Sequence, residues 1–192
     1  MVQTSLLELS ELASTVSDME SFYPALASVI QPLFHTDNFH IVLENSWQEL
    51  ELSYCSDIQE NASFAQFNHE DWLHTYTGKV YQTKTLLRCD FVQNESSDES
   101  INYLKYSDKA YRDWLGVPLK RGNNVIGVIA IQSLSDQIQY QESYQKLLAF
   151  ISEYIVIAID RVRSREIMEV NIQERTKKLT DTNHKLQLEI AE

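Results

Sequence analysis

The sequence predicts an α+β fold, in which an antiparallel sheet is flanked by helices and followed by one long C-terminal helix. Two apolar runs, residues 114–119 and 125–133, are separated by a turn with Gly and Asn and predict a hairpin of central strands. Residues 39–43 and 49–54 predict a second, shorter hairpin. From residue 140 onward the chain contains neither Pro nor Gly, which favours one continuous helix.

Two helices are expected before the first hairpin. The first has apolar residues at alternating three- and four-residue steps: Leu6, Leu9, Ala13 and Val16. This narrow seam is typical of helix-on-helix packing, so residues 1–17 are predicted to be an N-terminal dimerisation helix. The second helix is expected to be capped by Ser21, with Pro24 in its first turn, and Pro32 should kink or end its last turn.

The middle of the chain has weaker patterns. Residues 69–76 predict a short helix that ends at Gly78, and residues 80–87 predict another strand. Residues 88–112 are polar and then rich in Tyr. Because a structureless link of that length is unusual inside a compact domain, we expect it to form a mobile cover over a binding cavity.

Charge narrows the classes of partner. The 192 residues include 16 Lys plus Arg and 28 Asp plus Glu, a net charge of −12, which disfavours binding to nucleic acid or to an anionic membrane. No Lys or Arg precedes Lys79, so a signal peptide is not expected. The longest apolar runs, residues 125–131 and 155–159, are far shorter than the roughly 20 residues of a membrane helix. A cytoplasmic location is therefore predicted.

The long helix divides into two parts by charge. Residues 161–192 carry seven basic and six acidic residues, so the part of the chain before residue 161 holds a net charge of −13. This shift predicts a globular domain over residues 18–162 and a helical extension over residues 163–192. A heptad seam links the two parts through Ile151, Ile155, Ala158, Val162, Arg165, Glu169, Ile172, Thr176, Leu179, Asn183, Leu186 and Ile190. The seam predicts a parallel homodimer, with Asn183 fixing its register.

Several kinds of catalytic and metal site are not expected. The four glycines are too far apart for a dinucleotide-binding turn or a phosphate-binding loop. Cys55 and Cys89 are far apart in the sequence with no other Cys, so neither a zinc knuckle nor a disulfide is predicted. Cys89 follows a basic residue, and a redox-responsive thiol there is the alternative to an inert one.

The histidines also predict no metal site. His69 and His74 are five residues apart, which places them about 140° apart around a helix, so they cannot chelate one zinc ion from one face. His35 and His40 have the same spacing. Surface or capping roles are expected for both pairs.

An aromatic group next to the central hairpin is the candidate ligand site. The predicted pocket residues are Trp72, Cys89, Tyr103, Tyr106, Tyr111 and Trp114. Aromatic side chains supply flat apolar walls with a polar edge, although ordinary core packing uses the same residue types. The acidic domain favours a neutral or cationic small molecule over a strongly anionic one. Glu60 is expected on the surface.

The central hairpin also resembles a known family. Residues 114–119, Gly122, residues 125–133 and the helix end at residues 157–161 resemble the C-terminal half of a GAF domain, and the resemblance extends over residues 18–162. It implies a six-stranded antiparallel sheet with helices on both faces, a ligand cavity under covering loops and often a helical dimer. The Asn-Lys-x-Asp-Glu signature of cyclic-nucleotide binding and the Cys-His pair of bilin attachment are missing, and no haem signature is found, so the cofactor stays unspecified.

The tail resembles the signalling helix that joins bacterial sensor domains to their output domains. The resemblance implies an input domain that binds a small ligand and changes helix packing, with a diguanylate cyclase or, alternatively, a histidine kinase beyond residue 192. A constitutive dimerisation module without ligand is a further alternative. Methionine-sulfoxide reductases share the fold but use clustered cysteines, so no catalytic residue is predicted. The chain ends within a heptad, and we expect it to be part of a longer protein.

Overall fold

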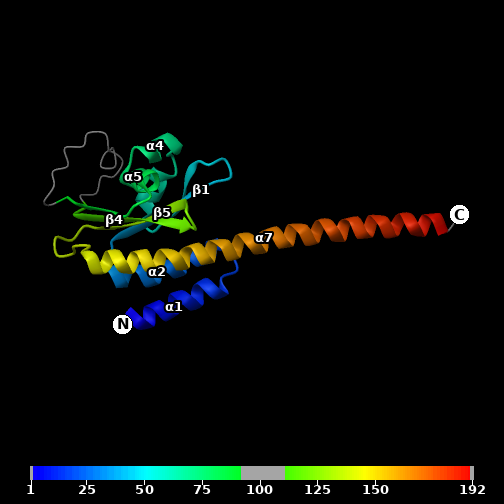
Figure 1. The fold of residues 1–192 in the computed structure, drawn as a ribbon, viewed down its shortest axis with the longest axis horizontal. Coiled ribbons are helices and arrows are strands. Elements are labelled where there is room, and N and C mark those ends of the chain that lie inside the picture. Colours follow the sequence, from blue (N-terminus) through cyan, green and yellow to red (C-terminus); the bar gives the residue numbers. More distant parts are fainter. Residues whose placement is uncertain (1, 92–110, 191–192) are drawn as a thin grey trace.

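A five-stranded antiparallel sheet forms the centre of the computed structural model (Figure 1). The structure describes residues 2–91 and 111–190, with side chains in the last helix as far as residue 182. The strands are β1 (Asn38–Glu44), β2 (Leu50–Cys55), β3 (Leu87–Asp90), β4 (Asp113–Arg121) and β5 (Asn124–Ser133), in the order β2-β1-β5-β4-β3. The helices are α1 (Val2–Thr15), α2 (Met19–Phe34), α3 (Ile58–Phe64), α4 (His69–Leu73), α5 (Tyr76–Thr83) and α7 (Glu142–Ile190).

The helices form layers on both faces of the sheet. Helices α2 and α7 cover the inner face, with α1 packed on both of them, and α3, α4 and α5 cover the outer face (Figure 1). The predicted α+β class and the two hairpins are confirmed. The resemblance implied six strands, and five lie within the described ranges.

Helix α2 differs from the prediction in its N-cap, and it extends beyond Pro32. Asp18, not Ser21, is the N-cap, because its carboxylate accepts the Ser21 backbone N–H at 2.7 Å. Pro32 does not end the helix, which continues to Phe34. Phe34 is fully buried against the inner face, so tertiary packing holds this turn helical despite the missing N–H.

The prediction for residues 69–87 was wrong in its boundaries. Two short helices, α4 and α5, replace the single one, and the strand begins only at Leu87. Gly78 lies inside α5, where a Cβ atom would lie 2.2 Å from the Trp72 backbone oxygen. The glycine therefore permits close contact between α4 and α5 and does not end a helix.

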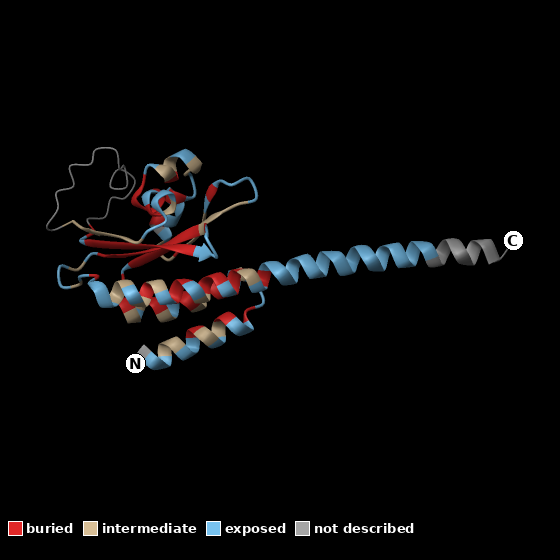
Figure 2. Cartoon of the chain, viewed as in Figure 1, coloured by how far each residue is buried: buried red, intermediate tan, exposed pale blue. Residues whose placement is uncertain are grey.

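Helix α7 is continuous but changes surroundings along its length. Up to Val162 it has buried side chains packed on the inner face and on α1, whereas residues 163–182 are all exposed (Figure 2). Within the two described ranges, no helix combines the length and the apolar character that crossing a membrane requires.

Candidate functional site

The outer face of the sheet brings the predicted pocket residues together. Trp72 from α4 and Trp114 from β4 are fully buried, and Tyr111 is 3% exposed. Half-buried Cys89 pairs with Trp114 across β3 and β4 and packs against the same apolar cluster. Tyr103 and Tyr106 lie outside the described residues.

Aromatic rings fill much of the space above this face. The Trp114 ring lies 5.6 Å from Tyr76 and contacts the backbone of its neighbour Gly116, where a Cβ atom would lie 2.3 Å from the indole. The Trp72 ring lies 5.3 Å from Phe64. The two tryptophans thus lie within an aromatic wall contributed by both the sheet and the covering helices.

Five polar side chains are buried within this apolar surrounding. We define the outer-face polar cluster as Asn38, His40, Glu60, Thr77 and Gln132, none of which is more than 3% exposed. Strand alternation places Asn38 and His40 of β1 beside Gln132 of β5, because Asn38 pairs with Gln132 in the sheet register. α3 and α5 contribute Glu60 and Thr77 from above.

Hydrogen bonds join the cluster into a network. The His40 Nε2 atom lies 2.9 Å from Thr77 Oγ1, and its Nδ1 atom lies 3.4 Å from Gln132 Nε2. A neutral ring that accepts at Nδ1 donates from Nε2, so Thr77 accepts from His40. Asn38 Nδ2 donates to Gln132 Oε1 at 3.3 Å and to a Glu60 carboxylate oxygen.

Asn38 also holds the start of α3 against the sheet. Its Oδ1 atom accepts from the Ser56 hydroxyl at 2.8 Å, from the Asp57 backbone N–H at 3.0 Å and from the Cys55 thiol at 3.5 Å. One amide side chain therefore connects β1, the end of β2 and the helix that carries Glu60.

Burial sets the protonation states of the site. It lowers the pKa of His40 from 6.5 to about 3, so the ring is neutral near pH 7. It also raises the pKa values of the Cys55 and Cys89 thiols to about 12. Burial and, secondly, the nearby Glu60 carboxylate raise the pKa of Tyr111.

The thiols cannot act together. Cys55 ends β2 and Cys89 lies in β3, the two edges of the five-stranded sheet. Four strand intervals of about 4.8 Å separate them by about 19 Å, far beyond disulfide reach.

Two residues of the outer-face polar cluster correct the sequence predictions. His40 was expected in a surface or capping role and Glu60 on the surface, but both are buried. The exposed His35 and His74 do lie at the C-terminal ends of helices, and His69 Nδ1 accepts the Leu50 backbone N–H. The available signal in the sequence was that Asn38 and His40 alternate with apolar residues in β1. This alternation places both side chains on one face of the strand, but it does not show whether that face is covered.

A buried indole N–H lies within the aromatic wall of the outer face. The Trp72 indole Nε1 is enclosed and has no hydrogen-bond acceptor among the described residues. Because a buried polar group normally has a partner, this donor is a candidate contact for a ligand atom. No group of three or more metal-ligating side chains occurs in the described part of the chain.

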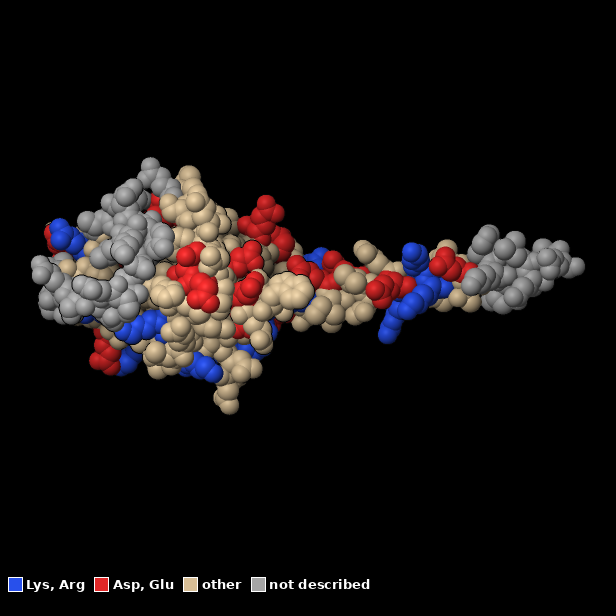
Figure 3. All heavy atoms as spheres, turned by 90° about the horizontal axis from the view of Figure 1, so that it is seen from above, with Lys and Arg blue, Asp and Glu red and all other residues tan. Residues whose placement is uncertain are grey.

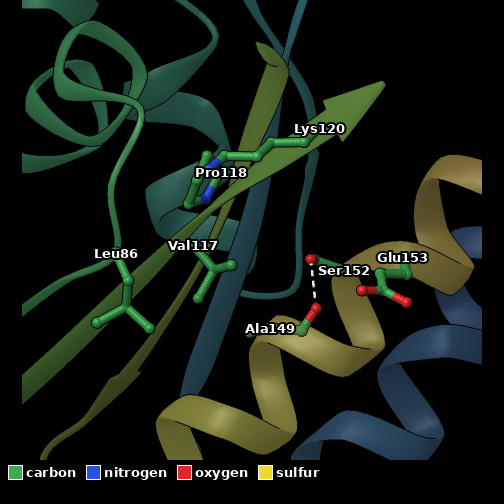
Figure 4. A pocket seen from close by; sticks show the side chains of 7 residues that line it. All are labelled: Leu86, Val117, Pro118, Lys120, Ala149, Ser152 and Glu153. Carbon is green, nitrogen blue, oxygen red and sulfur yellow. Dashed lines mark hydrogen bonds between the residues drawn. The ribbon is translucent and has the colours of Figure 1, made fainter. Parts of the chain in front are cut away.

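A separate cavity of about 240 Å³ lies on the inner side, between β4 and α7 (Figure 4). It is lined by Leu86, Val117, Pro118, Lys120, Ala149, Ser152 and Glu153. The Ser152 hydroxyl donates to the Ala149 backbone oxygen at 2.6 Å, so this hydroxyl already has a partner. Lys120 and Glu153 are exposed, and the cavity offers less polar recognition than the outer face.

The predicted dimer seam divides along α7. Ile155 and Val162 are buried in the core of their own chain, whereas Ile172 and Leu179 are more than 60% exposed. Asn183, Leu186 and Ile190 lie in α7 beyond the described side chains. In the view of Figure 3, acidic side chains lie in several separate groups on the domain, with some basic ones beside them, and both signs of charge occur along the exposed helix.

Comparison with known proteins identifies the family of this fold. A family model described as the GAF domain matches residues 18–159. The search of curated proteins found no significant match.

Solved structures show the same fold at low identity. The GAF domain of a phosphoenolpyruvate-protein phosphotransferase from Acinetobacter is 16% identical, covers 84% of this chain and 94% of its own, and has a TM-score of 0.69. The corresponding domain from Coxiella burnetii is 11% identical, with 86% and 96% covered and a TM-score of 0.70. Free methionine-R-sulfoxide reductase from Neisseria meningitidis, in complex with its substrate, is 14% identical, with 85% and 91% covered and a TM-score of 0.66.

Proposed function

The chain belongs to the GAF domain family, and on this premise we propose that it is a sensory domain that binds a small ligand at the outer face of its sheet. The observation that supports this function best is the outer-face polar cluster. Burying five polar side chains costs free energy unless hydrogen bonds compensate it, and an apolar core without them would fold as well. Such a cluster inside an aromatic wall is typical of a binding pocket.

The ligand we propose is a neutral or cationic small molecule. The net charge of −13 over residues 1–160 repels a strongly anionic ligand at long range. The Trp72 indole N–H offers a donor for a carbonyl or hydroxyl oxygen, and the aromatic side chains offer flat surfaces for an apolar or cationic group.

The signal would leave through α7. This helix packs on the inner face opposite the site and continues beyond Val162 without a break. A ligand with different affinity for two packings of the helices would shift their populations, and the extension would transmit that shift. We propose a diguanylate cyclase as the output domain, with a histidine kinase as the alternative, and a homodimer through the terminal helices as the active form.

A catalytic function has less support. The thiols of Cys55 and Cys89 are protonated near pH 7 and lie at opposite edges of the sheet. The sulfoxide reductase chemistry of the structural relative from Neisseria meningitidis is therefore not proposed for this chain. The second candidate is a dimerisation module whose outer face is filled by its own aromatic side chains, since Trp72 and Trp114 occupy space there.

Tryptophan fluorescence tests ligand binding directly. Trp72 and Trp114 are buried at the site, whereas Trp47 is 82% exposed, so a Trp47→Phe variant reports mainly on the site. We expect at least one neutral or cationic metabolite from a panel of amino acids, polyamines and nucleosides to shift the emission and raise the melting temperature. Bound ligand raises stability by mass action, by about 2.7 kcal/mol at one hundred times its Kd.

A matched variant separates binding from general stabilisation. Thr77→Val keeps the shape of the side chain but removes its hydrogen bond with His40, so it should weaken the binding of the active metabolite. Thr83→Val, at an exposed position of the same helix, should leave it unchanged. If no compound of the panel shifts either signal and native mass spectrometry finds no retained ligand, the dimerisation module is the better function.

A further inference from the structure

The cavity between β4 and α7 lies where the sheet loses a strand. β3 pairs with β4 only as far as Gly116, which lies opposite Leu87. In the described sheet, Val117 and the residues after it therefore have β5 on one side and no strand on the other. Pro118 fits this open edge, because a proline has no backbone N–H to donate to a neighbouring strand. The cavity is thus a space beside an unpaired strand edge, with α7 as its other wall.

Apolar side chains line most of this space. Leu86 and Val117 lie on the sheet side, with Pro118 at the strand edge, and the short side chain of Ala149 lies on α7 (Figure 4). An apolar cavity of about 150 Å³ can hold a benzene molecule, so about 240 Å³ has room for about ten non-hydrogen atoms, the size of leucine. The lining and the volume therefore fit a small ligand with an apolar end.

Two opposite charges line the same cavity without forming an ion pair. Lys120 comes from β4 and Glu153 from α7, and both are exposed. In the part of the chain that the structure describes, neither is ion-paired with the other or with a third side chain. Ser152 beside them is 6% exposed, and its hydroxyl oxygen can still accept a hydrogen bond while it donates to Ala149. The cavity thus offers a cation from the sheet, and an anion and an acceptor from the helix.

We propose that this cavity binds an apolar α-amino acid of about the size of leucine, at a second site separate from the outer face. The ligand carboxylate lies at Lys120, its ammonium group lies at Glu153 and the Ser152 oxygen, and its side chain packs on Val117 and Leu86. A zwitterion has no net charge, so the acidic domain does not repel it. An apolar ligand with only a carboxylate would meet Glu153 unfavourably, and one with only an ammonium group would leave Lys120 without a partner.

A ligand at this site contacts both the sheet and the helix that leads out of the domain. β4 and α7 pack against each other, and α7 continues from Glu153 through its last buried residue, Val162, into the exposed extension. A ligand that touches both walls favours the arrangement of β4 and α7 that it fits best. The cavity therefore gives α7 a second input that does not pass through the outer face.

Nuclear magnetic resonance locates the ligand on the full chain, labelled with the heavy isotope of nitrogen. On titration with L-leucine up to about 20 mM, we expect the backbone amide signals of Val117 and Ser152 to shift with a Kd of about 1 mM or below. Isocaproate has the leucine side chain without the ammonium group, and isopentylamine has it without the carboxylate. Each should bind at least about fivefold more weakly, because each loses one charged contact.

Charge substitutions at exposed positions test the contacts without disturbing the core. Lys120→Gln and Glu153→Gln each remove one charge from the cavity and should raise the Kd for L-leucine about fivefold or more. Glu166→Gln removes a charge from an exposed position farther along α7, and it should change the Kd by less than about twofold.

Three results would overturn the proposal. L-leucine at about 20 mM could move no amide signal around the cavity, isocaproate or isopentylamine could bind as tightly as leucine, or Lys120→Gln could bind leucine as well as Glu166→Gln does. Shifts confined to His40, Thr77 and their neighbours would also overturn it, while supporting the sensory site proposed for the outer face. Leucine binding at the cavity of a chain whose outer face binds no metabolite would support this site without the other.

Discussion

His40 illustrates how one residue links the fold to the site. It belongs to β1, an inner strand of the sheet, and its ring connects Thr77 of α5 with Gln132 of β5. A neutral imidazole can both donate and accept, so it serves both neighbours only while it stays unprotonated. Burial maintains that state, since no described carboxylate is hydrogen-bonded to the ring.

The stability of the domain should therefore fall as pH falls below 6.5. The folded pKa of His40 is about 3 against 6.5 in the unfolded chain, so the unfolded chain binds a proton that the folded chain does not. The stabilisation is complete well above the unfolded pKa of 6.5, and it is lost as the pH falls toward the folded pKa of about 3. Between about pH 7.5 and pH 5.5, the His40 contribution should lower the free energy of unfolding of the wild-type chain by about 1.4 kcal/mol. In the His40→Gln variant this decrease should be absent, and urea unfolding at the two pH values measures it.

The exposed His74 provides the control for this experiment. His74→Gln removes a histidine at the end of α4 and should keep the pH dependence of the wild-type chain. If His40→Gln shows the same pH dependence as the wild-type chain, then His40 is not held neutral by burial.

At the scale of elements, an ion pair ties the sheet to the beginning of α7. The Arg88 Nε atom of β3 lies 3.0 Å from both carboxylate oxygens of Asp113 in β4. The same carboxylate accepts the backbone N–H of Tyr140, two residues before α7, at 3.1 Å. Since Cys89 and Trp114, the next residues in sequence, face the outer site, this contact joins the site to the signalling helix.

Removing the charge of Asp113 should therefore be costly. Asp113→Asn keeps an acceptor for Tyr140 but loses the ion pair, and we expect a loss of about 2–3 kcal/mol in the free energy of unfolding. Asp136→Asn breaks the exposed pair with Arg112 and should cost less than about 1 kcal/mol. A double-mutant cycle combines Asp113→Asn with Arg88→Gln. A coupling energy near zero between the two substitutions would contradict the stabilising role of this ion pair.

At the scale of the whole molecule, an acidic domain is joined to an uncovered helix. Residues 1–160 hold a net charge of −13 and residues 161–192 hold +1. Two domains brought together by their helices must therefore overcome mutual repulsion, which salt screens. The extension supplies apolar contact away from the repelling domains.

A chain that ends at Arg161 should form a weaker dimer. Loss of the exposed apolar residues of the extension, such as Ile172 and Leu179, should raise the dissociation constant about tenfold or more. Raising salt from about 0.05 M to about 0.5 M should partly restore association. Sedimentation equilibrium measures both effects. If the full chain and the chain that ends at Arg161 have the same dissociation constant for the dimer, the extension contributes no contact between copies.

The sequence by itself determined the elements whose signal is local. Two apolar runs and the Gly122 turn between them specify the β4–β5 hairpin, and the absence of Pro and Gly specifies α7. Tyr111 and Trp114 were identified as pocket candidates because they are aromatic residues next to this hairpin in the sequence, and Trp72 joined them from the predicted short helix. These patterns depend on backbone geometry, which is the same in any tertiary context.

Only the tertiary structure decided which faces are covered. Burial of His40 and Glu60 depends on α3 and α5 lying above the outer face, and neither helix position follows from the residues of β1. The division of the α7 seam into a covered and an exposed part likewise depends on the inner face and α1 covering Ile155 and Val162. Burial depends on contacts between segments far apart in the chain. A local pattern can therefore show that two sets of side chains point to opposite faces of a strand, but not which helices cover each face.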